Sequence, residues 1–351
     1  MSKIKGYIGT YTKGESKGIY SFTLHTTKGL LGEVKLVAEV EDPTYLSISD
    51  NQETLYSVAK KDSQGGIASY AINKADGALD FINMQVTEGA SPCHVSIDHN
   101  EKHVLSANYH KGSLEVHPVK NRVIEHVTSV ILYEGKGPNS ERQEKPHIHF
   151  SGFTPDQKYV VAIDLGTDKL DTYKLQELTL TKVQSLSLAP GCGPRHITFH
   201  PNGKFAYVMT ELSNEIIVLT YNSEDGSFKE IQYNLAVPID YRFQNQGAAI
   251  HISADGRFIY ASIRGHNSIA VFKVNEETGK LSLVEHVSTE GLWPRDFSLD
   301  PTEEFLVVAN QESNNLSLFE RDKETGKLTI LQSDVPVPCP VCVKFLGKQQ
   351  A

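Results

Sequence analysis

Charged and imidazole side chains stand among apolar strand residues at a few places in this sequence of 351 residues. They include His149, Arg195, Glu211, Arg264 and Arg295. A partly buried histidine or glutamate whose pKa approaches neutrality acts as a general base. Arginine donors stabilise an oxyanion, and they bind an anionic group through two N–H groups at once. These residue types therefore suit acid–base chemistry on a small anionic molecule.

The same residues occupy equivalent positions in a repeated sequence pattern. Counted from one turn residue in each copy, the sixth preceding residue is Thr44, Cys93, His149, Arg195, Ala248 and Arg295. The position after it holds Tyr45, His94, Phe150, His196, Ala249 and Asp296. Ten residues beyond the turn come Lys60, Tyr109, Leu165, Glu211, Arg264 and Gln311. Polar groups that recur in this way predict a concave site around one axis.

The repeat itself predicts a β-propeller. Its turn residues lie 46 to 56 residues apart, and they are Asp50, His99, Pro155, Pro201, Ala254 and Pro301. This spacing is about the size of one four-stranded propeller blade. Short segments of alternating polarity, such as residues 258–263, indicate strands, and the glycines of ETGKL and EDGSF indicate tight hairpins. No segment of 12 or more residues has a convincing helical period, so we expect an all-β fold.

The two ends of the sequence predict how the ring closes. The segment VPCPVCVKFL, residues 337–346, has the pattern of a lone innermost strand. Residues 3–40 have the pattern of three strands that lack an innermost one. Joined, they form one composite blade that hides both sheet edges. We therefore expect a single domain, residues 1–351, that forms one seven-bladed propeller. Two insertions, residues 133–145 and 238–246, precede innermost strands and are expected on the face where the channel opens.

Each candidate residue also has a purely structural interpretation. A lone strand histidine is often only hydrogen-bonded, and Arg195 and Arg264 have Glu211 or Asp296 available as ion-pair partners between blades. The H-x-H spacing of His147 and His149 can serve a metal, but no third ligand is evident among so many arginines. Cys339 and Cys342 form a CxxC without a second pair. We therefore expect no metal and no cofactor.

Composition excludes several classes of function. The chain has 34 basic and 43 acidic residues and a formal net charge of −9, which argues against a nucleic-acid partner. No apolar run reaches membrane-spanning length, and the N-terminus lacks the apolar core of a signal peptide. Four cysteines are too few for a disulfide framework. We expect a cytoplasmic protein, a monomer or a weak homo-oligomer, with no membrane partner.

Several motifs resemble those of one family. They are the opening YIGTYT, KPHIHF, the innermost starts GPRH and WPRD, TEL after the GPRH strand, and IRGHNSIAVF. These motifs resemble those of bacterial 6-phosphogluconolactonases of the seven-bladed propeller type, over essentially the full length and in the expected order along the chain. Fungal carboxymuconate-lactonising enzymes share that fold. The resemblance implies hydrolysis of 6-phospho-D-glucono-1,5-lactone in the pentose phosphate pathway, by a carboxylic ester hydrolase.

The resemblance also implies site residues. The muconate-cyclising relatives place a histidine, two arginines and a glutamate around the channel, and these correspond here to the catalytic candidates His149, Arg195, Glu211 and Arg264. For the phosphorylated sugar lactone, Arg295 with Arg264 or Lys60 is the expected phosphate clamp. The further substrate-binding candidates are His94, His147, His196 and Asp296. Two alternatives stay open: a cyclase or lactonase acting on another lactone, and a non-catalytic propeller that binds a protein or peptide.

Overall fold

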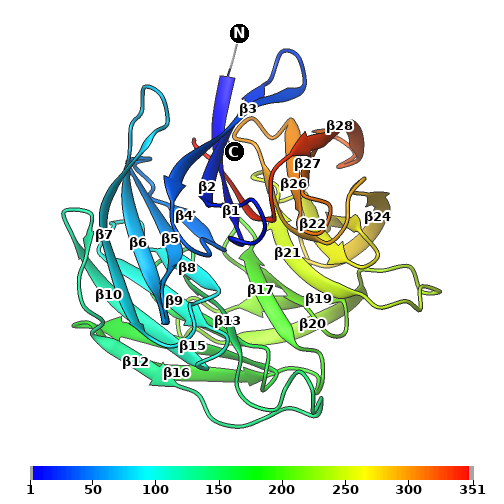
Figure 1. Ribbon diagram of the computed structural model, residues 1–351. Coiled ribbons are helices and arrows are strands. Elements are labelled where there is room, and N and C mark those ends of the chain that lie inside the picture. The colour runs from blue at the N-terminus through cyan, green and yellow to red at the C-terminus, as the bar shows by residue number, and fades with distance from the viewer. Residues whose placement is uncertain (1–2, 348–351) are drawn as a thin grey trace.

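The computed structural model describes residues 3–347, so residues 1, 2 and 348–351 of the expected domain lie outside the described part. Within the described part, 29 strands form seven separate sheets (Figure 1). These residues contain no helix, and so none that could span a membrane. The expectation of an all-β propeller with seven blades is confirmed.

Each sheet begins with a strand near the centre and continues outward along the chain. The second sheet holds β4 (Leu46–Ile48), β5 (Thr54–Lys61), β6 (Gln64–Ile72) and β7 (Leu79–Glu88). The third sheet holds β8 (His94–Ile97), β9 (His103–Asn108) and β10 (Ser113–Lys120), and both β11 (Val123–Ile124) and β12 (Ser129–Leu132) pair with β10. The fourth sheet holds β13 (Ile148–Phe153), β14 (Val160–Asp164), β15 (Lys169–Gln176) and β16 (Thr179–Ser187).

The last three sheets repeat this order. The fifth holds β17 (Pro194–Phe199), β18 (Phe205–Thr210), β19 (Glu215–Tyr221) and β20 (Phe228–Leu235). The sixth holds β21 (Gln246–Ile252), β22 (Phe258–Arg264), β23 (Ser268–Val274) and β24 (Leu281–Ser288). The seventh holds β25 (Pro294–Leu299), β26 (Phe305–Asn310), β27 (Asn315–Arg321) and β28 (Leu328–Pro336).

The remaining sheet, here called the first, joins the two ends of the chain, as the sequence predicted. Its order is β29 (Pro340–Phe345), β1 (Lys3–Thr10), β2 (Gly18–His25) and β3 (Leu30–Glu39). The red strand β29 is antiparallel to the blue strand β1, with Gly6 opposite Phe345 (Figure 1). Neighbouring innermost strands contact one another from β29 through β4, β8, β13, β17, β21 and β25 back to β29. The ring is therefore closed by packing and by one strand from the C-terminal end.

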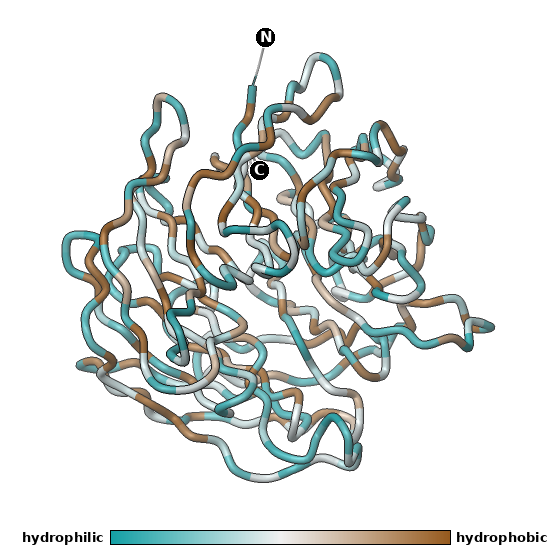
Figure 2. The backbone as a smooth tube through the Cα atoms, in the orientation of Figure 1, coloured by the Kyte–Doolittle hydropathy of each residue, from teal (hydrophilic) through white to brown (hydrophobic). Residues whose placement is uncertain are grey.

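The core lies between neighbouring sheets rather than in one central cluster. One apolar cluster joins the fifth and sixth sheets through residues such as Met209 and Phe272, and another joins the first and seventh. Apolar and polar residues alternate along many of the strands, as the tube in Figure 2 shows. Alternation of this kind turns one face of each sheet toward each neighbour. The blades thus stabilise each other pairwise.

A repeated tyrosine contact adds to this packing. The buried hydroxyls of Tyr7, Tyr207 and Tyr260 donate hydrogen bonds to hairpin carbonyl groups of the next sheet, those of Gly77, Gly279 and Gly326. All three glycines have φ between 68° and 75°, the conformation that ETGKL-type hairpins require. The hairpin turns predicted from the sequence therefore also set the spacing between blades.

Candidate active site

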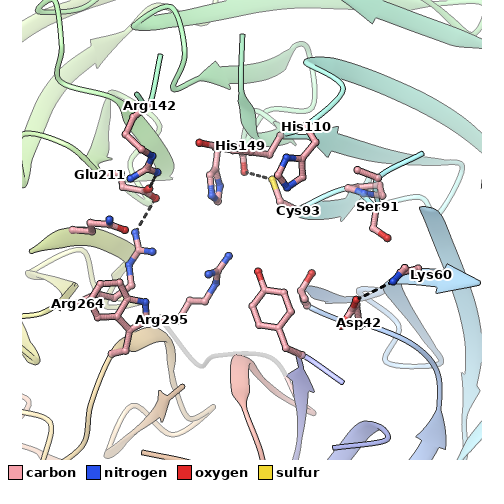
Figure 3. A pocket seen from close by; sticks show the side chains of 17 residues that line it. Asp42, Lys60, Ser91, Cys93, His110, Arg142, His149, Glu211, Arg264 and Arg295 are labelled. Atoms are coloured by element: carbon pink, nitrogen blue, oxygen red, sulfur yellow. Dashed lines mark hydrogen bonds and ion pairs between the residues drawn. The ribbon is translucent and has the colours of Figure 1, made fainter. Parts of the chain in front are cut away.

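A cavity of about 590 Å³ lies where the innermost strands begin and the second strands end. Its lining includes two sets of residues at the predicted equivalent positions. From the starts of the innermost strands come Thr44, Cys93, His149 and Arg295. From the ends of the second strands come Lys60, Tyr109, Glu211 and Arg264 (Figure 3). The repeat-based alignment therefore brought together residues from six different sheets.

A β-bulge presents the side chains of the innermost strands to this cavity. In the fourth, fifth and seventh sheets, the strand register shifts across one residue, and that residue is His149, Arg195 or Arg295. The extra residue in a bulge leaves the regular ladder and bends the strand locally. The bulge thus gives the site side chains a direction that strict alternation would not give.

Glu211 is the centre of an arginine cluster. Its Oε2 lies 3.1 Å from Arg195 Nε and 2.8 Å from Arg264 Nη2, and its Oε1 accepts a bond from Arg142 Nη2. Arg195 and Glu211 are both 3% exposed, and Arg264 is 4% exposed. The ion pairs between Glu211 and both predicted arginines are present. They join the fifth sheet to the sixth and fix two guanidinium groups beside the cavity.

Arg142 was not singled out from the sequence, although it lies in the insertion of residues 133–145. This insertion is held by Gln143, which is fully buried and donates 2.8 Å bonds to the Leu165 carbonyl and to Asp168 Oδ1. Arg142 itself is partly exposed and lines the cavity. The other insertion, residues 238–246, contributes Gln246 to the lining. The first insertion thus reaches the cavity through Arg142, and the second reaches it only through its last residue.

The charge state of Glu211 follows from this cluster. Burial raises its pKa, but the charges of Arg264, Arg195 and Arg142 outweigh burial and hold the pKa well below the usual value. An ionised carboxylate with so low a pKa is a poor general base near neutral pH. Glu211 therefore suits a positioning role, in which it orients arginines rather than accepting a proton.

His149, unlike Glu211, is uncharged at neutral pH. Burial, and next the charge of Arg195, lower its pKa well below the usual value, so the imidazole is neutral at neutral pH. Its side chain is 4% exposed and lines the cavity, and its Nδ1 atom has no hydrogen-bond partner. A neutral imidazole at a cavity wall can accept a proton from water. Glu211 is held by three guanidinium groups, whereas the Nδ1 atom of His149 has no partner, so the geometry favours His149 over Glu211 as the general base.

Cys93 does not offer a second reactive group. Burial raises the pKa of its thiol to about 12, so the thiolate is absent at neutral pH. Its sulfur lies 3.6 Å from the carbonyl oxygen of His149. The thiol therefore supports the backbone at the bulge instead of supplying a nucleophile.

Two cations of the cavity are less fully neutralised than the arginines around Glu211. No carboxylate lies within 4 Å of Arg295 in the described chain, and its guanidinium stands 5.3 Å from the ring centre of Tyr11. Lys60 has only long contacts, 3.9 Å to Asp42 and 4.0 Å to Glu41. These two groups, from the seventh and second sheets, are placed to receive an anion.

Four other predicted binding residues do not line this cavity. His147 stacks on Tyr109 with its Nδ1 2.9 Å from the Tyr109 carbonyl. Asp296 accepts a 3.0 Å bond from the Val343 amide and ties β25 to the closing strand. His94 and His196 belong to an aromatic layer further along the channel. His94, His196 and Asp296 directly follow the innermost-strand positions of the repeat, and their side chains lie deeper in the channel.

Sequence reasoning also missed lining residues outside the repeated positions. They are Tyr11, Asp42, Ala90, Ser91, Pro92, His110, Arg142, Gln246 and Trp293. Trp293 has a φ of 65° and places its ring 5.6 Å from the guanidinium of Arg264. The signal that would have found it is its place directly before Pro294 and Arg295, at the start of an innermost strand.

The side chains that could ligate a metal are not gathered at one place. Within residues 3–347, no group of three or more His, Cys, Asp or Glu side chains is placed to hold a metal ion. Cys339 and Cys342 both carry free thiols, and Cys342 is buried on β29. Burial raises the pKa of the Cys342 thiol, so this cysteine has the properties of a small core residue.

Known proteins share this architecture. A family model described as Lactonase, 7-bladed beta-propeller, matches residues 5–345. The chain is 58% identical over 347 residues to the 6-phosphogluconolactonase of Bacillus subtilis (strain 168), with 99% of each chain covered. A solved structure from Lactobacillus plantarum matches with a TM-score of 0.94 and 42% identity, covering 98% of this chain and 100% of that chain. The periplasmic gluconolactonase PpgL of Pseudomonas aeruginosa matches with a TM-score of 0.92 and 32% identity, covering 98% and 99%. This chain therefore belongs to the family of seven-bladed β-propeller lactonases.

Proposed function

We propose that this protein hydrolyses 6-phospho-D-glucono-1,5-lactone to 6-phosphogluconate. The observation that carries the proposal is the neutral imidazole of His149, which shares one cavity with a fixed arginine cluster and two weakly paired cations. The 58% identical Bacillus subtilis relative bears the name of this activity. A base, a set of oxyanion donors and an anion site are the three elements that hydrolysis of a phosphorylated lactone requires.

In the proposed mechanism, His149 accepts a proton from a water molecule that attacks the lactone carbonyl. The negative charge that develops on the carbonyl oxygen faces the guanidinium groups of Arg264 and Arg142, which line the cavity. When the ring opens, the imidazolium of His149 returns the proton to the departing ring oxygen. Arg195 does not line the cavity, and it holds Glu211 and the Ala248 carbonyl in place. We therefore assign Arg195 and Glu211 positioning roles.

The charges of the lining match a phosphorylated substrate. Four permanent cations, Arg142, Arg264, Arg295 and Lys60, face two carboxylates, Asp42 and Glu211. With His149 neutral, the lining carries two excess positive charges, which balance a phosphate dianion. Arg295 offers a planar pair of donors for two phosphate oxygens, and Lys60 adds a point charge. The phosphate end of the substrate is therefore proposed to lie between Arg295 and Lys60.

One comparison of substrates tests this function. Acid release is followed from freshly generated 6-phosphogluconolactone and from unphosphorylated glucono-1,5-lactone, each corrected for spontaneous hydrolysis. We expect kcat/KM to be at least about 100-fold higher for the phosphorylated lactone, because a charged group that pairs with Arg295 contributes about 2–3 kcal/mol. Equal turnover of both lactones would instead support a lactonase for another substrate. Turnover of neither lactone would contradict the proposal.

We also propose that the ring is a single folding domain. Strands β1 and β29 share one sheet although they lie at opposite ends of the described chain. Every other sheet also contacts two neighbours through its innermost strand. Thermal unfolding should therefore give one transition by calorimetry and by tyrosine fluorescence, and two separated transitions would contradict a single domain.

A further inference from the structure

A second cavity, of about 460 Å³, opens at the other end of the channel. The innermost strands that begin at the first cavity contribute their far ends to the second, through residues such as Ile48, Ser96, Phe153 and Leu299. An aromatic layer separates the two cavities. In this layer the His94 ring lies 4.2 Å from Tyr45, 4.4 Å from Phe150 and 5.5 Å from His196, centre to centre. The proposed reaction uses no residue of the second cavity.

Lys344 supplies a positive charge to this cavity. It lies on β29, with its ammonium 4.6 Å from the ring centre of Tyr45 and 3.4 Å from the Tyr45 hydroxyl. No carboxylate lies within 4 Å of it among residues 3–347. The nearby carboxylate of Asp296 is already engaged by the Val343 amide and by His251 Nε2. Lys344 is half-buried, and Asp296, its nearest counter-charge, is not in direct contact with it, so the ammonium can still pair with an anion in the cavity.

The charge on Lys344 persists at neutral pH. Burial lowers its pKa, but its interactions with Tyr45, Cys342 and Asp296 outweigh burial and raise the pKa above the usual value. His94, in contrast, is neutral because burial, and next the charge of Lys344, lower its pKa well below the usual value. The second cavity therefore presents one net positive charge from these two residues.

Unpartnered polar atoms lie beside this charge. His94 is 3% exposed and its Nδ1 atom has no hydrogen-bond partner, although the residue lines the cavity. The Oγ of Ser96, two residues along the same strand, is also buried without a partner. Buried polar atoms in proteins are nearly always satisfied, so an orphan at a cavity wall indicates a ligand atom or a water. Both atoms belong to residues of β8 that line the cavity together with Lys344.

The remaining lining selects the kind of anion. The cavity lining, taken over residues 3–347, contains no aspartate or glutamate. It combines neutral polar side chains, such as Gln52 and Gln157, with an apolar wall that includes Ile48, Phe153 and Pro301. One cation balances a monoanion better than a phosphate dianion, and apolar walls bind a hydrocarbon body. Both features match a small carboxylic acid with an aromatic or branched body.

We propose that the second cavity is a binding site for a small apolar monocarboxylate. The carboxylate group pairs with Lys344 and with donors of β8, Ser96 foremost, and the hydrocarbon part lies against the apolar wall. This site is distinct from the lactone cavity. The proposal that it binds a monocarboxylate does not depend on the proposed hydrolysis.

The test uses 4-fluorobenzoate as the probe, titrated into the full-length protein and followed by ¹⁹F NMR. We expect saturable binding that weakens at least 10-fold in Lys344→Met and at least 3-fold in Ser96→Ala, while Lys273→Met, an exposed lysine on β23, binds as the wild type does. Arg295→Met should also bind unchanged, which excludes the lactone cavity as the binding place. Lys344→Met should keep lactone turnover, so this test and the test of the function give separate answers.

Results other than those expected would contradict the proposed binding site. Absence of saturable binding to the wild type, or equal binding by wild type and Lys344→Met, would overturn it. Inorganic phosphate that displaces the probe at lower concentration than benzoate does would overturn the monocarboxylate assignment. Should Lys344→Met fail to fold, as judged by circular dichroism, Ser96→Ala alone decides, because Ser96 is half-buried and its hydroxyl has no hydrogen-bond partner to lose.

Discussion

Arg264 Nη2 lies 2.8 Å from Glu211 Oε2, and the same nitrogen donates a 2.7 Å bond to the carbonyl of Gly247. The guanidinium is thereby held by the fifth sheet and by the innermost strand of its own sheet. The same side chain also lines the cavity. A substrate oxyanion would meet an arginine whose position is already fixed, which is the arrangement that electrostatic stabilisation favours.

Replacing Glu211 by Gln should destabilise the fold as well as lower activity. Three guanidinium groups would lose their shared counter-charge, and breaking a buried ion pair from one side costs about 3–5 kcal/mol. We expect the free energy of unfolding in urea to fall by about 3 kcal/mol, discounted because Arg142 is partly exposed and reaches water. The control is Glu277→Gln on an exposed hairpin. A Glu211→Gln protein as stable as the control would contradict the role assigned to this carboxylate.

Replacing His149 by Asn should remove the general base. Turnover of 6-phosphogluconolactone is expected to fall about 100-fold or more, the usual contribution of general base catalysis. The matched control is His126→Asn, which changes an exposed histidine away from the cavity. Both proteins should keep the wild-type circular dichroism spectrum. Near-normal turnover by His149→Asn would refute the assignment of the base.

The pH profile should show where His149 loses its proton-accepting form. Burial and Arg195 lower its pKa, so the neutral base persists as the pH falls through about 6.5, where an ordinary histidine becomes half protonated. We expect kcat/KM to stay level between about pH 7.5 and pH 6 and to fall only at lower pH. Initial rates in constant-ionic-strength buffers measure this. A halving near pH 6.5 would mean that the base has an ordinary pKa.

Replacing Arg295 by Met should affect the phosphate end of the substrate. We expect KM for 6-phosphogluconolactone to rise about 10- to 100-fold, because a hydrogen bond between charged groups contributes about 1.5–3 kcal/mol. Turnover of unphosphorylated gluconolactone should change little. A variant that loses both activities equally would place Arg295 at the reacting carbonyl instead. Lys60→Met should give a smaller effect, since Lys60 is partly exposed.

Acid should destabilise the fold through the histidines of the channel. Burial is the main cause that lowers the pKa of His94, of His149 and of His196. Below about pH 6.5 the unfolded chain takes up protons that the folded chain does not, so stability is present above that pH and is lost as the pH falls. Each histidine contributes a slope of about 1.4 kcal/mol per pH unit.

Urea unfolding between pH 7.5 and pH 5.5 measures this loss. In His94→Gln, the free energy of unfolding should depend less steeply on pH, by the equivalent of about one proton. The reason is that Gln carries no charge at any of these pH values. His126→Gln, at an exposed site, should leave the slope unchanged. A slope in His94→Gln equal to that of the wild type would show that His94 is protonated in the folded state.

Most of the fold could be predicted from the sequence because each blade repeats the same local signals. Alternating strands, φ > 0 glycines such as Gly279 and Gly326, and the unmatched strand at the C-terminal end led to seven blades with a composite closure. These signals depend on residues that are near in sequence. The equivalent positions of the repeat then placed His149, Glu211 and Arg264 at one cavity.

The rest of the site depends on contacts that a repeat does not encode. Arg142 reaches Glu211 from an insertion with no counterpart in other blades, and the buried Gln143 that holds it has no marker in the sequence. Neighbouring residues such as Arg195 and His196 take different places because the strand bulges between Pro194 and His196, a local distortion that residue types alone do not specify. The ionisation of Glu211 and His149 likewise depends on burial.

The bulged positions have a further consequence for how such an enzyme can change. A residue outside the regular ladder can be exchanged without breaking the hydrogen bonds that hold its strand, so the chemistry of the cavity can be altered one blade at a time. The sixth sheet also has a bulge, between Gly247 and Ile250, but its residues Ala248 and Ala249 are fully buried and do not line the cavity. New substrate preferences can therefore arise, or be engineered, by single substitutions at bulged residues that line the cavity, such as His149 and Arg295, whereas the bulged Arg195 also holds two blades together.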